Sequence, residues 1–245
     1  MKHLSLALLF LALITSCSKD DTDSSKIHRV ATIKHSSNSG PSLAFEYYPD
    51  GKLKQFERTG NYYGIYEYYA DSIVFTCYNL SASNGDINEL KYTTTYILNS
   101  DGLAISSVTV HTDNTRSLGS YEYDSNGFLT KAIEGGIETN YTISNENITY
   151  TADYYEGNIL TSESFECFSD KLNNTNSNLF NCFDYTKTGA DFLGKRGKNL
   201  LKESFFTNTD GYSYTYEYTY TFDSKGRIVK MTISSGNYFD ITYAD

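Results

Sequence analysis

The chain has 245 residues, a formal net charge of −10 and a sequence pI near 4.9. This acidity argues against nucleic acid as a partner, because nucleic-acid binding requires clustered lysine and arginine. Tyr and Phe are abundant, at 24 and 14 residues, and Trp is absent, which is typical of β-strands. Because no stretch carries apolar residues at helical spacing, the composition predicts an all-β protein.

The first residues have the features of a bacterial lipoprotein signal peptide. Lys2 and His3 give a positive start, and residues 4–14 are apolar but too short to span a bilayer. Residues 13–17, Leu-Ile-Thr-Ser-Cys, resemble the lipobox that precedes a lipidated cysteine. The alternative is a plain secreted protein with an incidental cysteine. The sequence therefore predicts a signal peptide over residues 1–16 and lipidation of Cys17, with this lipid as the sole membrane attachment.

Residues 17–26 are small, polar and charged, and they predict a flexible tether between the lipid and the folded part. Residues 18–21, Ser-Lys-Asp-Asp, resemble the tag of surface-exposed lipoproteins of the Bacteroides group. That resemblance implies an outer-membrane lipoprotein displayed at the cell surface, with retention on the periplasmic face as the alternative. Residues 27–245 contain no internal linker, so we expect a single all-β domain there.

Three cysteines follow the lipobox. Cys167 and Cys182 flank a polar loop, and in an oxidising compartment they are candidates for a disulfide. Cys77 lies in a strand-like segment and is expected to be an inert buried thiol. His28, His35 and His111 are separated and are expected at the surface or at strand edges. No metal-ligand spacing occurs, so we expect neither a metal nor another cofactor.

A hairpin repeat supplies most of the information on the fold. Four tight turns end in glycine, namely Gly51, Gly102, Gly127 and Gly226. Each turn either opens on Asn or Asp or carries proline at its second position. Each glycine is predicted to adopt positive φ and to form a bulge. In such hairpins the residue four before glycine faces the residue two after it, which predicts the pairs Tyr47/Leu53, Leu98/Ala104, Tyr123/Leu129 and Phe222/Ile228.

The spacing of these glycines predicts how many strands there are. The intervals of 51, 25 and 99 residues suggest a unit of about 25 residues, with a drifted copy at residues 154–158. The expected fold is an antiparallel meander of ten to fifteen strands.

Residues 212–222 alternate aromatic and polar side chains, as in a sheet with one solvated face. A transmembrane barrel is the alternative, but its lipid face would then consist mostly of tyrosine. We therefore expect a soluble, strongly curved sheet or barrel-like fold.

Residues 191–202 interrupt the alternation and contain the only cluster of basic residues in the sequence. Lys195, Arg196 and Lys198 are candidates for binding an anion or an acidic glycan. The alternative is a connector that faces its charges to water. Its apolar residues would then plug the sheet end, namely Phe192, Leu193, Leu200 and Leu201.

Three features together resemble an uncharacterised family of Bacteroides-group lipoproteins with a porin-like β fold. They are the Tyr-Asp-x-x-Gly hairpins, the stretch 98–104, and the segment 193–201 followed by 218–223. The resemblance covers most of residues 30–243. It implies a fold and a cell-surface setting, and it implies no catalytic residue.

No nucleophile elbow, P-loop or dinucleotide-binding glycine pattern occurs, so we do not expect an enzyme. The first hypothesis is a non-catalytic binding module for glycan or peptide that uses its tyrosines. The second is a structural or assembly subunit of an outer-membrane complex that docks through sheet edges or apolar patches. A hydrolase is the third. The sequence leaves the oligomeric state open.

Overall fold

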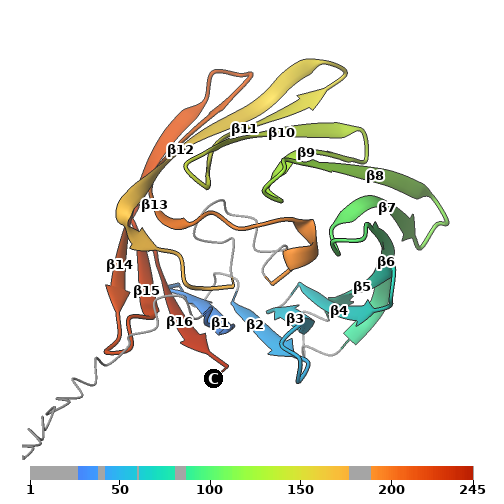
Figure 1. Cartoon of the computed structure of the whole chain (residues 1–245), viewed down its shortest axis with the longest axis horizontal. Helices are drawn as coiled ribbons and strands as arrows, with labels where there is room; N and C mark the ends of the chain where they lie inside the picture. The colour runs from blue at the N-terminus through green and yellow to red at the C-terminus, as the bar shows by residue number, and fades with distance from the viewer. Residues whose placement is uncertain (1–26, 38–41, 60, 81–86, 177–188, 245) are drawn as a thin grey trace, which may run out of the picture.

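The computed structural model describes residues 27–37, 42–59, 61–80, 87–176 and 189–244. In these ranges, sixteen antiparallel strands pair in chain order, and β1 pairs with β16 to close a barrel (Figure 1). The strands are β1 Val30–His35, β2 Leu43–Tyr47, β3 Leu53–Arg58, β4 Tyr62–Tyr68, β5 Ser72–Leu80, β6 Ile87–Leu98, β7 Ala104–His111, β8 Arg116–Tyr123, β9 Leu129–Glu134, β10 Ile137–Ser144, β11 Asn147–Tyr155, β12 Asn158–Leu172, β13 Asn199–Asn208, β14 Ser213–Phe222, β15 Ile228–Ile233 and β16 Tyr238–Tyr243. The expected all-β, barrel-like fold is confirmed, and the strand number exceeds the predicted range.

The two faces of the wall follow the alternation in the sequence. In β14, Tyr218 is buried and Tyr214, Tyr216 and Tyr220 are half-buried, whereas the Ser, Thr and Glu residues between them are exposed. Successive strand residues point to opposite faces, so the aromatic face forms the lumen and the polar face forms the outer wall.

The four predicted glycine turns are present with the predicted registers. Their glycines have φ of +89°, +78°, +85° and +73°, and all four expected cross-strand pairs form. In the second turn the Asn99 side-chain oxygen accepts hydrogen bonds from the backbone N–H groups of Asp101 and Leu103. Each turn joins an even-numbered strand to an odd-numbered one, so all four lie at the same end of the barrel. We call this the glycine-turn end.

The repeat interpretation was wrong in two places. The 99 residues between Gly127 and Gly226 contain six described strands instead of the eight that four units would give, and no strand is described between Leu172, where β12 ends, and Asn199, where β13 begins. The supposed copy at residues 154–158 is a two-residue hairpin turn with positive φ at both Glu156 and Gly157. It joins β11 to β12 and therefore lies at the opposite end.

The described residues of the segment between β12 and β13 enter the barrel. These residues, 173–176 and 189–198, form what we call the lumenal segment, which includes the short 3₁₀ helix η3 Asp191–Leu193. Figure 1 shows the part before β13 inside the ring of strands. The segment is held at the glycine-turn end, where the Lys195 backbone N–H donates to the Gly127 carbonyl at 2.9 Å. Asn176 bridges the Val30 backbone N–H and the Tyr47 hydroxyl, both at 2.9 Å.

Tyrosines tie successive strands together at this same end. Each lies late in an even-numbered strand and donates its hydroxyl to the carbonyl of a residue near the start of the preceding odd-numbered strand, at 2.7–2.9 Å. The five donor–acceptor pairs are Tyr47–Val30, Tyr68–Leu53, Tyr123–Ala104, Tyr220–Leu201 and Tyr243–Ile228. Burial raises the pKa of Tyr47 to about 12, so this hydroxyl keeps its proton at physiological pH.

The tyrosine–carbonyl bonds predict a specific loss of stability. Tyr68→Phe removes the 2.9 Å bond to the Leu53 carbonyl and should lower the free energy of unfolding by about 1 kcal/mol. The neighbouring Tyr69 is 55% exposed, so Tyr69→Phe should change it by less than about 0.5 kcal/mol. Urea unfolding followed by circular dichroism measures both variants. Equal effects of the two substitutions would show that the bond does not stabilise the barrel.

Candidate functional site

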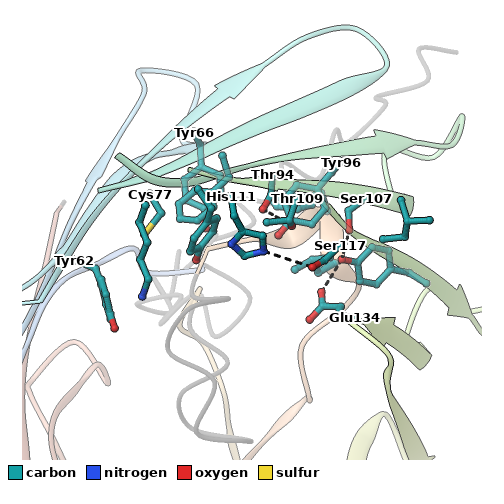
Figure 2. A pocket seen from close by; sticks show the side chains of 18 of the residues that line it. Tyr62, Tyr66, Cys77, Thr94, Tyr96, Ser107, Thr109, His111, Ser117 and Glu134 are labelled. Carbon is teal, nitrogen blue, oxygen red and sulfur yellow. Dashed lines mark hydrogen bonds between the residues drawn. The ribbon is translucent and has the colours of Figure 1, made fainter. Parts of the chain in front are cut away.

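A cavity of about 380 Å³ lies in the lumen between strands β3–β9 and the lumenal segment (Figure 2). Its size falls in the range of small-molecule sites. Phe192 and Leu193 from η3 are among its lining residues, and both are buried. Lining residues nearer the end opposite the glycine turns, such as Ser117 and Glu134, are at least partly exposed. The lumenal segment therefore forms the floor of the cavity.

Aromatic rings line the deepest part of the cavity. Tyr66 contacts Phe75 with ring centroids 4.6 Å apart, and Tyr96 contacts Phe192 at 4.9 Å. A glycine makes room for this packing, because a Cβ atom at Gly64 would lie 2.5 Å from the Phe75 ring. We call Tyr66, Phe75, Tyr96 and Phe192 the aromatic floor.

Hydroxyl groups line the wall beside the aromatic floor. The hydroxyl oxygens of Thr94 and Thr109 lie 2.8 Å apart, and those of Ser107 and Tyr121 lie 3.1 Å apart. The Tyr121 hydroxyl also donates to a Glu134 carboxylate oxygen at 2.6 Å. Burial, and then the Glu134 charge, raise the pKa of Tyr121, so this hydroxyl remains a donor.

Gly119 makes the close approach of these groups possible. A Cβ atom there would lie 2.3 Å from the Ser107 hydroxyl oxygen and 3.2 Å from the Tyr121 hydroxyl. The Gly119 backbone therefore lies directly against these hydroxyl groups. We call the side chains of Thr94, Thr109, Ser107 and Tyr121 the hydroxyl wall.

Basic residues line the cavity from three strands: Arg58 at the end of β3, Lys91 in β6 and His111 at the end of β7. The Lys91 ammonium lies 3.9 Å from the centroid of the Tyr62 ring. The His111 Nε2 atom lies 3.4 Å from the Ser117 hydroxyl oxygen. Among the described lining residues, Glu134 is the one carboxylate. The cavity thus combines an apolar aromatic floor, a hydroxyl wall and a surplus of basic groups.

Cys77 also lines this cavity and is buried, as the sequence predicted. It is 3% exposed, and burial raises the pKa of its thiol, so the unreactive protonated form is favoured. Within the described ranges, no group of three or more His, Cys, Asp or Glu residues is arranged to hold a metal ion.

The predicted basic cluster lies at the other end, and its members have different surroundings. Arg196 has a side chain that is only 19% exposed; its guanidinium donates to the Thr175 carbonyl and lies 3.8 Å from the Asp191 carboxylate. It therefore joins parts of the lumenal segment. Lys198 pairs with Glu146 at 2.6 Å.

Lys195 is exposed beside the Phe128 ring. Phe192, Leu193, Leu200 and Leu201 are all buried, which fits the alternative interpretation of this segment as a connector that plugs one end. Anion binding by the three basic residues stays a prediction.

The remaining predicted site residues fall partly outside the structure. Cys17, with the signal peptide and the tether, and Cys182 lie outside the described residues. Cys167 lies in β12, where burial and then the Glu166 charge raise the pKa of its thiol to about 11. Its pairing with Cys182 stays a prediction. The described residues contain no helix long and apolar enough to cross a membrane.

The sequence analysis missed the lumenal cavity. It placed His111 at a surface or edge, whereas the structure places it among the lining residues. One available signal was the alternation of Tyr92, Thr94 and Tyr96 in β6, which puts three polar-tipped side chains on one face. That these meet residues from β3 and β9 depends on barrel closure, which no local pattern encodes.

The two interpretations of the basic cluster predict different behaviour on substitution. If Arg196 holds the lumenal segment, Arg196→Met should lower the free energy of unfolding by about 1–3 kcal/mol, because it leaves the Thr175 carbonyl without this charged donor. Lys195→Met should change it by less than about 0.5 kcal/mol. Chemical denaturation of both variants gives the comparison. If Arg196→Met has a negligible effect, Arg196 does not hold the segment, and the interpretation of this residue as a ligand contact is favoured.

Comparison with known proteins supports the fold. No protein-family model matches the chain, and no curated protein matches it by sequence. Among solved structures, it is similar to a porin-like protein from Bacteroides uniformis ATCC 8492, with a TM-score of 0.65 and 14% identity over 87% of this chain and 97% of that one. It is also similar to a porin-like protein from Bacteroides vulgatus ATCC 8482, with a TM-score of 0.60 and 15% identity over 88% and 98%. The chain therefore has a porin-like closed β-barrel fold.

Proposed function

We propose that this protein is a non-catalytic binding protein of the bacterial cell envelope that holds a small carbohydrate in its lumenal cavity. The observation that carries the proposal is the pairing of an aromatic floor with a hydroxyl wall. A sugar ring has an apolar C–H face that packs on aromatic rings, and its hydroxyl groups both donate and accept hydrogen bonds. Tyr96 and Phe192 offer the first kind of contact, and Thr94, Thr109 and Ser107 offer the second.

The envelope location rests on the lipobox at Cys17 and on the likeness of the barrel to Bacteroides porin-like proteins. In this proposal the lipid is the anchor and the barrel wall faces water. Ion pairs between neighbouring strands on the polar outer face support that orientation, because a charged pair in hydrocarbon carries a large desolvation cost. They are Glu46–Lys54, Lys131–Glu138, Glu166–Lys202 and Lys230–Asp240.

Two features of the structure bear on the competing functions. An assembly subunit that docks through sheet edges needs an unpaired strand, whereas each described strand pairs on both sides. A glycosidase needs two carboxyl groups flanking the bond that is cleaved, whereas the described lining of the cavity provides Glu134 alone. Both observations favour a binding role for the cavity.

Carbohydrate binding is tested with a glycan and peptide array and then by calorimetry with the best ligands. Tyr96→Leu should weaken binding about tenfold or more, because it removes a ring from the floor. Tyr155→Leu is the matched control, since Tyr155 is 49% exposed and does not line the cavity. Absence of binding across the array, together with recovery of an envelope protein from cells, would favour the assembly role instead.

The anchor has a separate test. Cys17→Ala should release the protein from the membrane fraction of cells that produce it, because a folded domain with a water-facing wall has no other attachment. Fractionation followed by immunoblotting measures the distribution, with the unsubstituted protein as the reference. Continued membrane retention of the variant would contradict both the lipid anchor and the water-facing wall.

A further inference from the structure

The charge of the cavity is opposite to the charge of the chain. The whole chain carries −10, yet Arg58, Lys91 and His111 line the cavity and Glu134 is the one carboxylate among its described lining residues. Two further carboxylates, on Asp153 and Glu163, lie at strand positions that face the lumen from β11 and β12, but neither lines this cavity. A local surplus of positive charge in an acidic protein is the kind of feature that selects a ligand by its charge.

The Glu134 carboxylate and the Lys91 ammonium occupy different parts of the cavity. Glu134 accepts a hydrogen bond from Tyr121, and Figure 2 shows it on the opposite side from Tyr62. The Lys91 ammonium lies over the Tyr62 ring, so it too is remote from Glu134. Glu134 is therefore engaged with Tyr121 and does not pair with the Lys91 ammonium.

Lys91 is the most informative of the three bases. It is half-buried, and within the described parts of the chain no carboxylate lies within ion-pair distance of its ammonium. Other lysines in the same structure, such as Lys131, Lys198 and Lys202, do pair with glutamate. A lysine ammonium that is partly shielded from water and lies over an aromatic ring is stabilised further by an anion that accepts its hydrogen bonds.

The arrangement of these groups defines a ligand class. We infer that the cavity binds an acidic sugar, whose anionic group is held by Arg58, Lys91 and His111 while its ring lies against the aromatic floor. This inference rests on the proposed function and specifies its substrate class. A carboxylate and a phosphate both supply the required charge, and both pair well with guanidinium and ammonium groups.

The test compares sugars that differ in the group at C6, neutral in one member and anionic in the other, using the purified protein and isothermal titration calorimetry. The pairs are glucuronate against glucose and galacturonate against galactose, and glucose 6-phosphate represents the phosphate source. The acidic member should bind at least about tenfold more tightly than its neutral partner. Raising the salt concentration should reduce this preference, since the ion pair lies near the solvent-exposed end of the cavity.

Substitutions assign the preference to the basic residues. Lys91→Met should weaken binding of the acidic sugar by more than it weakens binding of the neutral sugar, and so remove most of the advantage of the acidic member. Lys202→Met is the control, because its ammonium pairs with Glu166 on the outer face. Arg58→Gln provides a second variant, and thermal unfolding confirms that each variant is folded. If neither variant folds, the salt dependence of the unsubstituted protein decides the question.

The possible outcomes separate the two proposals. Equal affinity for acidic and neutral sugars would overturn the charge inference and leave carbohydrate binding in place. A preference for the acidic sugar that Lys91→Met does not change would also overturn it. Absence of binding by every member of the set would overturn the proposed function and the inference together.

Discussion

The width of the barrel is the constraint on which the rest of the structure depends. About eight strands give a barrel whose inward side chains just fill the interior, whereas sixteen or more leave open space. The sixteen strands described here fall in the second class. Large aromatic side chains narrow the lumen, and the lumenal segment occupies part of the remainder with Phe192 and Leu193. Because that segment is fixed at the glycine-turn end, the other end keeps a cavity.

The preference for tyrosine over other aromatic residues follows from the same constraint. A side chain long enough to reach into a wide lumen must not bury a polar group that lacks a hydrogen-bond partner. Tyrosine meets both needs when its hydroxyl reaches a carbonyl on a neighbouring strand, as Tyr68 and Tyr220 do. Burial raises the pKa of both residues, so they stay protonated and act as donors. Phenylalanine would supply the area without the cross-strand bond, and tryptophan would place its donor differently.

Local features of the fold were predictable, and non-local ones were not. The cross-strand pairs around Gly51, Gly102, Gly127 and Gly226 follow from turn chemistry within a few residues, and the structure reproduces their registers. Closure depends on pairing between β1 and β16, some two hundred residues apart in the chain. The site depends on the curvature that accompanies closure, because that curvature brings residues of β3 and residues of β9 to one cavity. Its lining residues therefore carried no recognisable motif.

The basic residues show the same difference between local and non-local features. Lys195, Arg196 and Lys198 are adjacent in sequence and formed a visible cluster, yet Arg196 is engaged within the lumenal segment and Lys198 with Glu146. Arg58 and Lys91 are far apart in sequence and line one cavity only in the folded barrel. Charge clustering along the chain was thus a poor guide to charge clustering in space.

If the cavity binds a ligand as proposed, its aromatic floor links that binding to the docking of the lumenal segment. Phe192 belongs to that segment, and its position depends on bonds made elsewhere by Arg196 and Asn176. A ligand that contacts Phe192 binds only when the segment is docked, so by linkage it stabilises the docked state by RT ln(1 + [L]/Kd). The reverse also holds, because any loosening of the segment lowers the fraction of molecules with a complete floor and weakens apparent affinity in proportion. Under the proposed function, the contacts at the glycine-turn end would therefore set the affinity of the cavity without touching the ligand.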